Sequence, residues 1–223
     1  MEKVYKNDLS KHLSFAEKII LPLRKEILES TLTGGTPLKQ DMLAQRFGVS
    51  ISALREALKV LEGEGLVEFV PNKGAFVKRL NADEAREIFD IRALIEAEAM
   101  NQSMELLTEE DFAAIDKILD EEEHCFDPVR YSDLNMRFHE ELYKHCPNQH
   151  LRTMIRTLHA NVSRYMTLYL DKMLHKELSQ CEHRKLAEAC RAKNKRLAKS
   201  VIKRHMERAG KELADYLHKH PEL

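Results

Sequence analysis

The chain has 223 residues, of which 43% are hydrophobic and 33% charged, the composition of a globular protein with enough apolar side chains for two domain cores. No segment approaches the roughly 18 consecutive apolar residues of a membrane-spanning helix, and the first residues lack the apolar stretch of a secretory signal, so we expect a cytoplasmic protein without membrane contact. The formal net charge of -1 combines segments of opposite sign, because residues 1–80 carry 13 basic and 10 acidic side chains, 82–145 carry 6 and 19, and 184–211 carry 11 and 2.

The first 80 residues contain six of the seven glycines, which indicates short elements separated by turns. The pattern predicts a helix over 14–31 and two short helices over 39–47 and 52–62, joined by a turn at 48–50. Apolar stretches at 66–70 and 74–78, separated by Pro71-Asn72-Lys73, predict a small hairpin. Because the glycine content drops near residue 80, we expect an N-terminal domain of residues 1–80.

Residues 81–223 have the pattern of long helices. Asn81 with Glu84, and Thr108 with Asp111, have the spacing of helix-capping boxes, and they open helices predicted to reach about residues 106 and 125. Further helices are predicted over 129–146, 150–174, 179–192 and 194–218, with no strand signal between them. This second domain is therefore expected to be an antiparallel all-helical bundle.

The two short helices and the hairpin of the first domain have the proportions of a winged helix-turn-helix, so the predicted fold is mainly α. In such a unit the N-terminus of the second helix reaches base edges in the major groove, and the hairpin lies along phosphates. At the N-terminus of the second helix stand Ser50, Ser52 and Arg55. On the hairpin stand Lys73, Lys78 and Arg79. The alternative is a small helical domain whose surface binds protein rather than DNA.

This segment resembles the DNA-binding domain of the GntR family over about residues 15–78. The match runs in order through Phe47-Gly48-Val49-Ser50, Leu54-Arg55-Glu56-Ala57-Leu58, Leu61-Glu62-Gly63-Glu64-Gly65 and Asn72-Lys73-Gly74. The resemblance implies DNA contacts, and our candidate set is Lys39, Ser50, Ile51, Ser52, Arg55, Lys73 and Gly74. The family commonly has arginine where this chain has Ile51 and Asp41. Isoleucine cannot form the bidentate contact to guanine but can touch a thymine methyl group, so we expect a different operator.

Three of the eleven histidines fall on apolar helix faces. Asn135 and His139 are four residues apart and share a face, while His183 and His205 each belong to an apolar stripe of another helix. A single inward histidine is more often a core residue than a ligand, but burying three imidazoles without a shared partner is costly. We expect the remaining histidines on the surface: His12, His124, His145, His150, His159, His175, His218 and His220. The four cysteines form no CxxC pair, which favours free thiols.

Residues 81–220 resemble the FCD sensor domain of the FadR subfamily. The residues that carry the match are Asp90-Ile91-Arg92, Glu96, Asn135, Phe138-His139, Glu182-His183-Arg184 and His205. The resemblance implies a divalent metal bound by Asn135, His139, His183 and His205, and a small carboxylate effector that completes its coordination. Imidazole suits several ions, with zinc and nickel the leading candidates. The family usually has an acidic residue where Asn135 stands, so the site keeps a larger positive charge and should attract an anion.

Arg92 is the candidate second contact of the carboxylate, and the alternative is a salt bridge between helices. The expected protein is thus a ligand-responsive repressor or activator that binds a palindromic operator as a homodimer. Two rival hypotheses are a metal-dependent, hydrolase-like enzyme with an accessory helix-turn-helix and a purely structural metal site. Against the enzyme, no acidic residue is tied to the histidines by spacing as a general base. The basic segment 184–211 is expected to be a solvated face or a complement to the acidic segment, rather than a second nucleic-acid surface.

Overall fold

The computed structural model describes residues 17–29, 31–79, 81–170 and 176–220, with side chains left out at Arg164 and 166–170. These residues form two compact units, one up to Lys78 (28–30 excepted) and one from Arg79 onward. Among the described helices, none is both long enough and apolar enough to cross a membrane.

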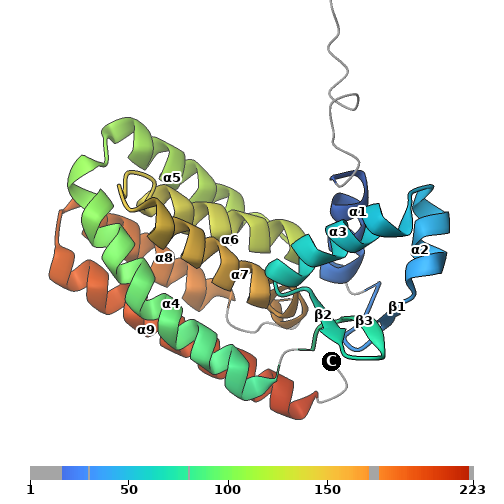
Figure 1. Cartoon of the computed structure of the whole chain (residues 1–223). Coiled ribbons are helices and arrows are strands. Elements are labelled where there is room, and N and C mark those ends of the chain that lie inside the picture. Colours follow the sequence, from blue (N-terminus) through green and yellow to red (C-terminus); the bar gives the residue numbers. More distant parts are fainter. Residues whose placement is uncertain (1–16, 30, 80, 171–175, 221–223) are drawn as a thin grey trace, which may run out of the picture. The chain divides into compact units, whose positions relative to one another are not determined.

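The N-terminal unit combines three helices with a small antiparallel sheet (Figure 1). Its elements are α1 (Glu17–Leu28), β1 (Pro37–Leu38), α2 (Gln40–Phe47), α3 (Ile51–Gly63), β2 (Val67–Val70) and β3 (Gly74–Val77). The strand order is β1-β3-β2, with Val67 opposite Val77 and Val70 opposite Gly74. The predicted hairpin is therefore present, and the unit has the winged helix-turn-helix architecture.

Gly48 and Ser50 form the turn between α2 and α3, the first by ending α2 and the second by beginning α3. Gly48 ends α2 at a φ of 65°, a left-handed conformation that glycine adopts without strain. Ser50 begins α3 as its N-cap, because its hydroxyl accepts a hydrogen bond from the Ala53 amide at 3.2 Å. The strand β1 was not predicted from sequence. It is only two residues long and exists because β3 offers it an edge to pair with.

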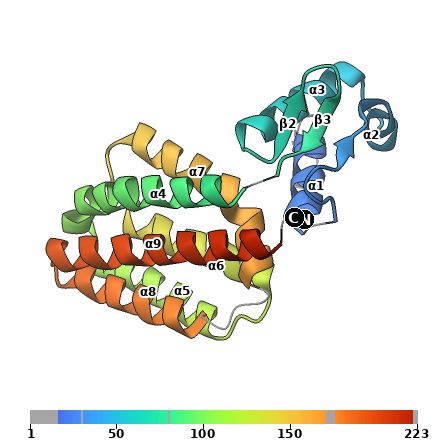
Figure 2. The ribbon, with the colours of Figure 1, turned by 90° about the horizontal axis from the view of Figure 1, so that it is seen from below.

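The C-terminal unit is a helical bundle without strands among the described residues. It contains α4 (Ala82–Ser103), a 3-10 turn η2 (Met104–Leu106), α5 (Glu109–Glu123), α6 (Pro128–Leu142), α7 (Gln149–Leu170), α8 (Lys176–Arg191) and α9 (Lys195–Lys219). Figure 2 shows the bundle from a second side. The predicted mainly α architecture is confirmed.

Local capping explains where several of these helices begin. Asn81 Oδ1 accepts from the Glu84 amide at 2.6 Å, and Thr108 and Asp111 form the reciprocal pair of a capping box. The predicted end of the third bundle helix at residue 146 is wrong, since α6 ends at Leu142. Pro147 disfavours helical backbone in the residue before it, so the helix ends earlier.

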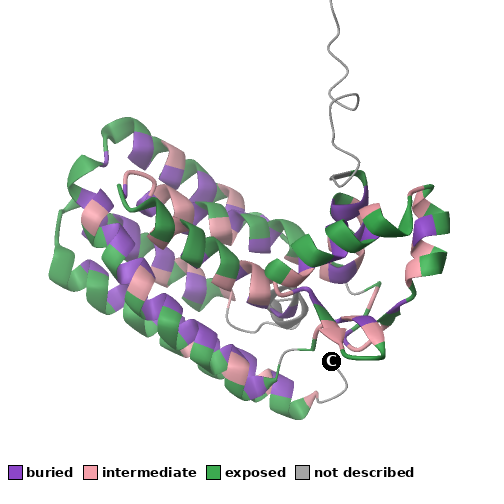
Figure 3. Cartoon of the chain, in the orientation of Figure 1, coloured by how far each residue is buried: buried purple, intermediate pink, exposed green. Residues whose placement is uncertain are grey.

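The helices α4 and α9 lie side by side along their lengths (Figures 1 and 2). Gly210 on α9 makes the close approach possible, because a Cβ atom at this position would lie 2.5 Å from Phe89 Cβ on α4. Figure 3 shows the buried residues on the inner sides of the helices. The inner sides of α4 and α9 thereby contribute to one hydrophobic core that also takes in α5, α6, α7 and α8.

Candidate functional site

Three buried imidazoles from three helices converge inside the bundle. His139 lies on α6, His183 on α8 and His205 on α9, and their exposed fractions are 2%, 0% and 5%. One ring nitrogen of each lies within 4.8 Å of those of the other two. The sequence placed these histidines on apolar faces, and the fold brings those faces together.

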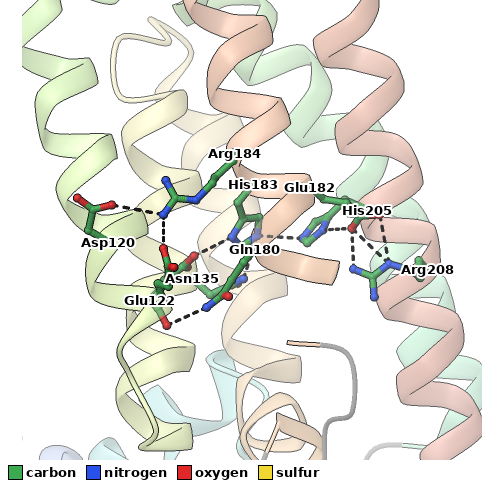
Figure 4. Close-up of polar contacts among 10 residues, drawn as sticks. Asp120, Glu122, Asn135, Gln180, Glu182, His183, Arg184, His205 and Arg208 are labelled. Carbon is green, nitrogen blue, oxygen red and sulfur yellow. Dashed lines mark hydrogen bonds and ion pairs between the residues drawn. The ribbon is translucent and has the colours of Figure 1, made fainter. Parts of the chain in front are cut away.

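The spacing of the imidazoles suits a shared ion. His183 Nε2 and His205 Nε2 are 3.3 Å apart, and Asn135 Nδ2 lies 3.3 Å from His183 Nε2 (Figure 4). Ligands held at about 2.0–2.1 Å around one metal ion lie about 3 Å from one another. Rotation of the Asn135 amide about its last side-chain bond exchanges its nitrogen and oxygen, and the oxygen can then serve as a ligand.

Each imidazole has a carboxylate on its Nδ1 side, buried for His139 and His183 and partly buried for His205. Glu122 Oε2 of α5 lies 2.9 Å from His183 Nδ1, and Glu182 Oε2 of α8 lies 2.8 Å from His205 Nδ1. Glu96 Oε2 of α4 lies 3.4 Å from His139 Nδ1, too poorly aligned for a hydrogen bond. A carboxylate that accepts from Nδ1–H leaves the Nε2 lone pair free for a metal, which is the usual arrangement behind metal-ligating histidines.

Several polar atoms at this centre lack a hydrogen bond although they are fully buried. They are both ring nitrogens of His139, Glu96 Oε2 and Glu122 Oε1. A buried polar atom without a partner costs about 1–3 kcal/mol, and because Glu96 lies on the Nδ1 side of His139, the Nε2 atom of that ring is the one left for another ligand. A divalent cation fits the donor set of three imidazoles and one amide, and the residues present therefore fit a metal.

Burial keeps His139 and His205 in the neutral form that binds metals. It lowers the pKa of His139 well below its usual range, and it lowers the pKa of His205 to about 4 although Glu182 opposes the shift. Burial also acts against ionisation of Glu182, but hydrogen bonds from His205 and Arg208 outweigh it and lower the pKa of this carboxyl to about 2. At neutral pH the pair is thus a neutral imidazole that donates to a carboxylate.

A small cavity adjoins the histidines. Its volume is about 20 Å³, enough for about one water molecule in this conformation. Besides Asn135, His139 and His205, its polar lining consists of Arg92, Tyr131, Ser132, His159, Ser179 and Arg208. The cavity offers cationic and hydroxyl donors next to the candidate metal position, as recognition of a small anion requires.

Arg92 faces inward as predicted and is 3% exposed. Its Nε donates to Glu96 Oε1 at 2.8 Å, so it does form a salt bridge, although within α4 rather than between helices. The same side chain also lines the cavity. Arg92 therefore forms a salt bridge and is also placed where it could contact a carboxylate, so the structure is compatible with both roles considered from the sequence.

Sequence reasoning missed four residues of this site. His159 was expected on the surface, but it is buried on α7, lines the cavity, and has a pKa that burial and the nearby Arg92 lower to about 3. A signal existed, because His159 follows Ile155 at helical spacing on an apolar face. His145, also expected on the surface, is partly buried and contacts Asp111, whereas His12 and His175 lie outside the described residues. The carboxylates of Glu96, Glu122 and Glu182 carried no spacing that tied them to the histidines.

The candidate DNA-contacting residues all lie at the surface of the N-terminal unit or near it. Ile51 is 42% exposed at the first turn of α3, and Arg55 donates from Nε to Gln40 Oε1 at 2.7 Å. Gly74 has a φ of 101° at the start of β3, beside the exposed Lys73. Lys39 precedes α2, and Ser50 and Ser52 flank the start of α3, all three exposed. These side chains are therefore accessible to a ligand as large as DNA.

Two family models match the chain. Residues 15–77 match the family described as bacterial regulatory proteins, gntR family, and residues 87–208 match the FCD domain. The transcriptional regulator YdhC of Bacillus subtilis (strain 168) is 29% identical over 187 residues, which is 82% of this chain and 84% of YdhC. The transcriptional repressor RspR of Escherichia coli (strain K12) is 23% identical over 194 residues, 86% of this chain and 85% of RspR.

A solved structure of a GntR-family transcriptional regulator from Pseudomonas syringae pv. tomato str. DC3000 is also similar. It is 30% identical, with a TM-score of 0.60, over 93% of this chain and 88% of that one. The matched families and relatives are transcriptional regulators and not enzymes, so the hydrolase alternative is not supported. The geometry agrees, since Glu122 and Glu182 face the Nδ1 atoms of the histidines rather than the centre among them.

Proposed function

This chain belongs to the GntR family of bacterial transcriptional regulators and carries an FCD domain, and on that premise we propose a repressor whose operator binding is controlled by a divalent metal and a small carboxylate. We take residues 1–80 as the DNA-reading domain and residues 81–223 as the sensor domain. The observation that carries the proposal is the convergence of three carboxylate-backed imidazoles beside a cavity lined by Arg92. Repression is favoured by the named activity of the relative RspR.

In the DNA-reading domain, the N-terminus of α3 enters the major groove and the β2–β3 turn follows the phosphates. Arg55 and Ser52 read base edges, while Ile51 contacts a thymine methyl group. Ser50 contributes to the same end of α3, although its hydroxyl is also the helix cap. Lys39, Lys73 and the Gly74 backbone contact phosphates, which positions the domain without selecting sequence. A regulator of this kind works where the chromosome is, in the cytoplasm.

In the sensor domain, Asn135, His139, His183 and His205 hold the metal, with zinc or nickel as the leading ions. Bound there, the ion supplies a positive centre to which a carboxylate binds. Asn135 is only partly buried and brings no charge, so three neutral imidazoles and an amide leave the charge of the ion uncompensated by its ligands. Arg92 is the second contact of the carboxylate, and His159 on the opposite helix lines the same space.

The regulator acts as a homodimer on a palindromic operator, because two-fold symmetry places two reading domains on two half-sites. Ligand binding changes how the two sensor domains hold the reading domains. Thermodynamic linkage makes this coupling reciprocal, so operator and effector change each other's affinity by the same factor.

A thermal-shift screen of small carboxylic acids on metal-loaded, full-length protein tests the proposal. We expect one or more acids to raise the melting temperature of the loaded protein and not of chelator-treated protein, since binding to the folded state alone stabilises it. Each such acid should then release operator DNA selected from a random library. If metal binds but no acid shifts the melting temperature, the centre is a structural metal site and the effector proposal fails.

A further inference from the structure

The outward sides of α4 and α9 form one continuous surface, here called the α4/α9 face. Two hollows of about 420 and 690 Å³ lie along it, and Leu94 of α4 and Lys203 of α9 border both. Leu94 is 68% exposed, and Ile91 and Leu197 on the same two helices are 45% and 46% exposed. A large apolar side chain that is two-thirds exposed between two hollows is typical of a surface that meets a partner.

The two helices that build this face carry opposite charge. The exposed charged residues of α4 are acidic at Asp83, Glu87, Asp90 and Glu98 and basic only at Arg86. The exposed charged residues of α9 are basic at Lys195, Arg196, Lys199, Lys203, Arg204, Lys211 and Lys219 and acidic at Glu207 and Asp215. An acidic helix therefore lies directly beside a basic one.

Much of this charge is not satisfied within the chain. Lys195 pairs with Glu105 at 3.3 Å and Lys203 with Glu207 at 3.5 Å. Within the described part of the chain, no ion pair is formed by Asp90, Lys199 or Lys211, although all three line the hollows. By contrast, the basic residues Arg184 and Arg191 of α8 do pair with acidic residues of α5. The predicted complement between the basic and acidic segments is thus present at α8 and at Lys195 of α9, whereas Lys199 and Lys211 of α9 form no ion pair within the described residues.

We propose that the α4/α9 face is the interface through which two copies of this chain form the dimer. The proposal rests on the function proposed above and names the surface that the dimer uses. A two-fold axis that runs along the seam between α4 and α9 lays α4 of each copy on α9 of the other, so acidic meets basic on both sides. A two-fold axis across the seam would place like charges together and is disfavoured. The surface is therefore complementary to itself in one orientation.

The size and composition of the face suit a dimer. A stable interface buries about 800 Å² on each partner. Helices of the length of α4 and α9 extend about 33 Å and 37 Å, and two such helices lie about 20 Å across, so the face has an area of this order. Leu94 and Ile91 form an apolar centre with charged residues around it, which is the usual anatomy of an interface. DNA is the less favoured occupant, since the acidic side of α4 would repel its phosphates.

The same two helices also carry the effector site on their inner sides. Arg92 and Glu96 belong to α4, while His205 and Arg208 belong to α9. Arg208 lines both the effector cavity and the larger surface hollow, and it donates to Glu182 at 2.6 Å and to Glu212 at 3.0 Å. A ligand that moves α4 against α9 thereby changes the surface that meets the partner, which gives the dimer a direct physical link to the effector.

Sedimentation-equilibrium measurements on the full-length chain test the interface. We expect wild-type protein at twice the chain mass and Leu94→Glu with a dimer dissociation constant raised about 30-fold or more, the effect of losing a central contact. Met154→Glu is the matched control, because Met154 is an exposed apolar residue of α7 away from this face, and its dissociation constant should stay at the wild-type value.

Charge reversal provides a test that misfolding cannot mimic. Asp90→Lys with Glu98→Lys makes both helices basic, so this variant alone should be mainly monomeric. Lys199→Glu with Lys203→Glu leaves α4 acidic and α9 nearly neutral, so this variant should dimerise more weakly than wild-type protein. Mixing the two variants should favour a dimer of unlike chains, because the acidic α4 of the second variant then meets the fully basic α9 of the first. Failure of the mixture to associate, while wild-type protein is dimeric, overturns the proposed interface.

The remaining outcomes separate this proposal from the function on which it rests. A wild-type chain that stays monomeric with metal, effector and operator present removes the dimer from the proposed function as well. A wild-type dimer that persists in Leu94→Glu and in both charge variants places the interface elsewhere and leaves the function standing. Variants that remain dimeric but bind DNA more weakly would show that the face contacts DNA, which also contradicts the proposal.

Discussion

His183 Nδ1 lies 2.9 Å from Glu122 Oε2, and both side chains are completely buried. A buried carboxylate needs compensation, and one hydrogen bond from an imidazole N–H supplies only part of it. In the proposed site a cation on the other side of the ring supplies the rest, so we expect the pair to be most stable when a metal is bound. The contact between Glu122 and His183 therefore connects the burial of a carboxylate with the proposed binding of a metal.

We expect Glu122→Gln to lower metal affinity about 10- to 100-fold, the usual effect of altering a residue behind a metal-ligating histidine. The amide still accepts from Nδ1–H, but the negative charge that favours the bound cation is lost. Competition with a chromogenic chelator measures the affinity. Glu123→Gln is the control, because that neighbouring carboxylate is exposed and pairs with Arg184. Equal affinities in both variants would argue against a metal held by His183.

Asn135→Asp should raise metal affinity and weaken binding of the carboxylate effector. The added carboxylate lowers the net charge of a divalent site from about +2 to about +1, which favours the ion and disfavours a second anion. Metal analysis after dialysis and effector titration measure the two effects. Asp133→Asn changes a carboxyl on the exposed face of the same helix and should alter neither by more than about twofold. Absence of metal from both wild type and Asn135→Asp would contradict the metal site itself.

In the reading domain, Arg55→Ala should cost about 1–3 kcal/mol of operator binding and relax base preference at one position in each half-site. Ile51→Arg should instead shift the selected operator toward guanine, because arginine can form the bidentate contact that isoleucine cannot. Selection from random DNA, followed by footprinting, checks both. If the wild-type protein selects the same operator as Ile51→Arg, with guanine at the position that arginine contacts, the role given to Ile51 is contradicted.

The stability contributed by Asp111 should depend on pH. Its carboxylate lies 2.5 Å from Lys144 Nζ and 2.7 Å from His145 Nε2, and it accepts from the Thr108 amide. Burial opposes ionisation, but these contacts outweigh it and lower the pKa of Asp111 below its usual value. A depressed folded-state pKa contributes stability that is complete above the unfolded-state pKa of about 3.9 and is lost as the pH falls toward the folded-state value.

Asp111→Asn should therefore reduce the free energy of unfolding at pH 7 by about 1.5–3 kcal/mol, the range for hydrogen bonds to a charged group. The difference from wild type should shrink below about pH 4, as the wild-type carboxyl becomes protonated. Urea denaturation of chelator-treated protein at several pH values measures it, and the exposed Asp116→Asn is the control. A difference that stays constant with pH would rule out an ionic contribution.

Gly210→Ala should destabilise the bundle by about 1–3 kcal/mol, because the new methyl group overlaps Phe89 where α4 and α9 approach most closely. Gly63→Ala has open space around its new Cβ and a backbone that alanine adopts, so it should be neutral or slightly stabilising. Thermal unfolding compares the two variants. A neutral Gly210→Ala would mean that α4 and α9 can separate without cost, and this would weaken the link drawn between the dimer face and the effector site.

Local sequence was sufficient for most of the helices, for the hairpin and for three of the inward histidines, although it missed β1 and His159 and placed the end of α6 too late. Gly48 and Ser50 set the turn before α3, Asn81 and Thr108 start their helices, and periodicity alone puts His139, His183 and His205 on apolar faces. Each of these depends on contacts within a few residues, which is why it can be read from the chain without knowing the fold.

Tertiary structure decided what surrounds those histidines. Glu122 belongs to the acidic run 121–123, and its helical spacing from Ile115 and Leu119 places it on the buried face of α5, but nothing local says which imidazole it meets. Which side chains Glu96 and His159 contact likewise depends on which helices pack against α4 and α7. Partners that are far apart in sequence meet only through packing, so the sequence named the three imidazoles, and the fold supplied the carboxylates that fit them to a metal.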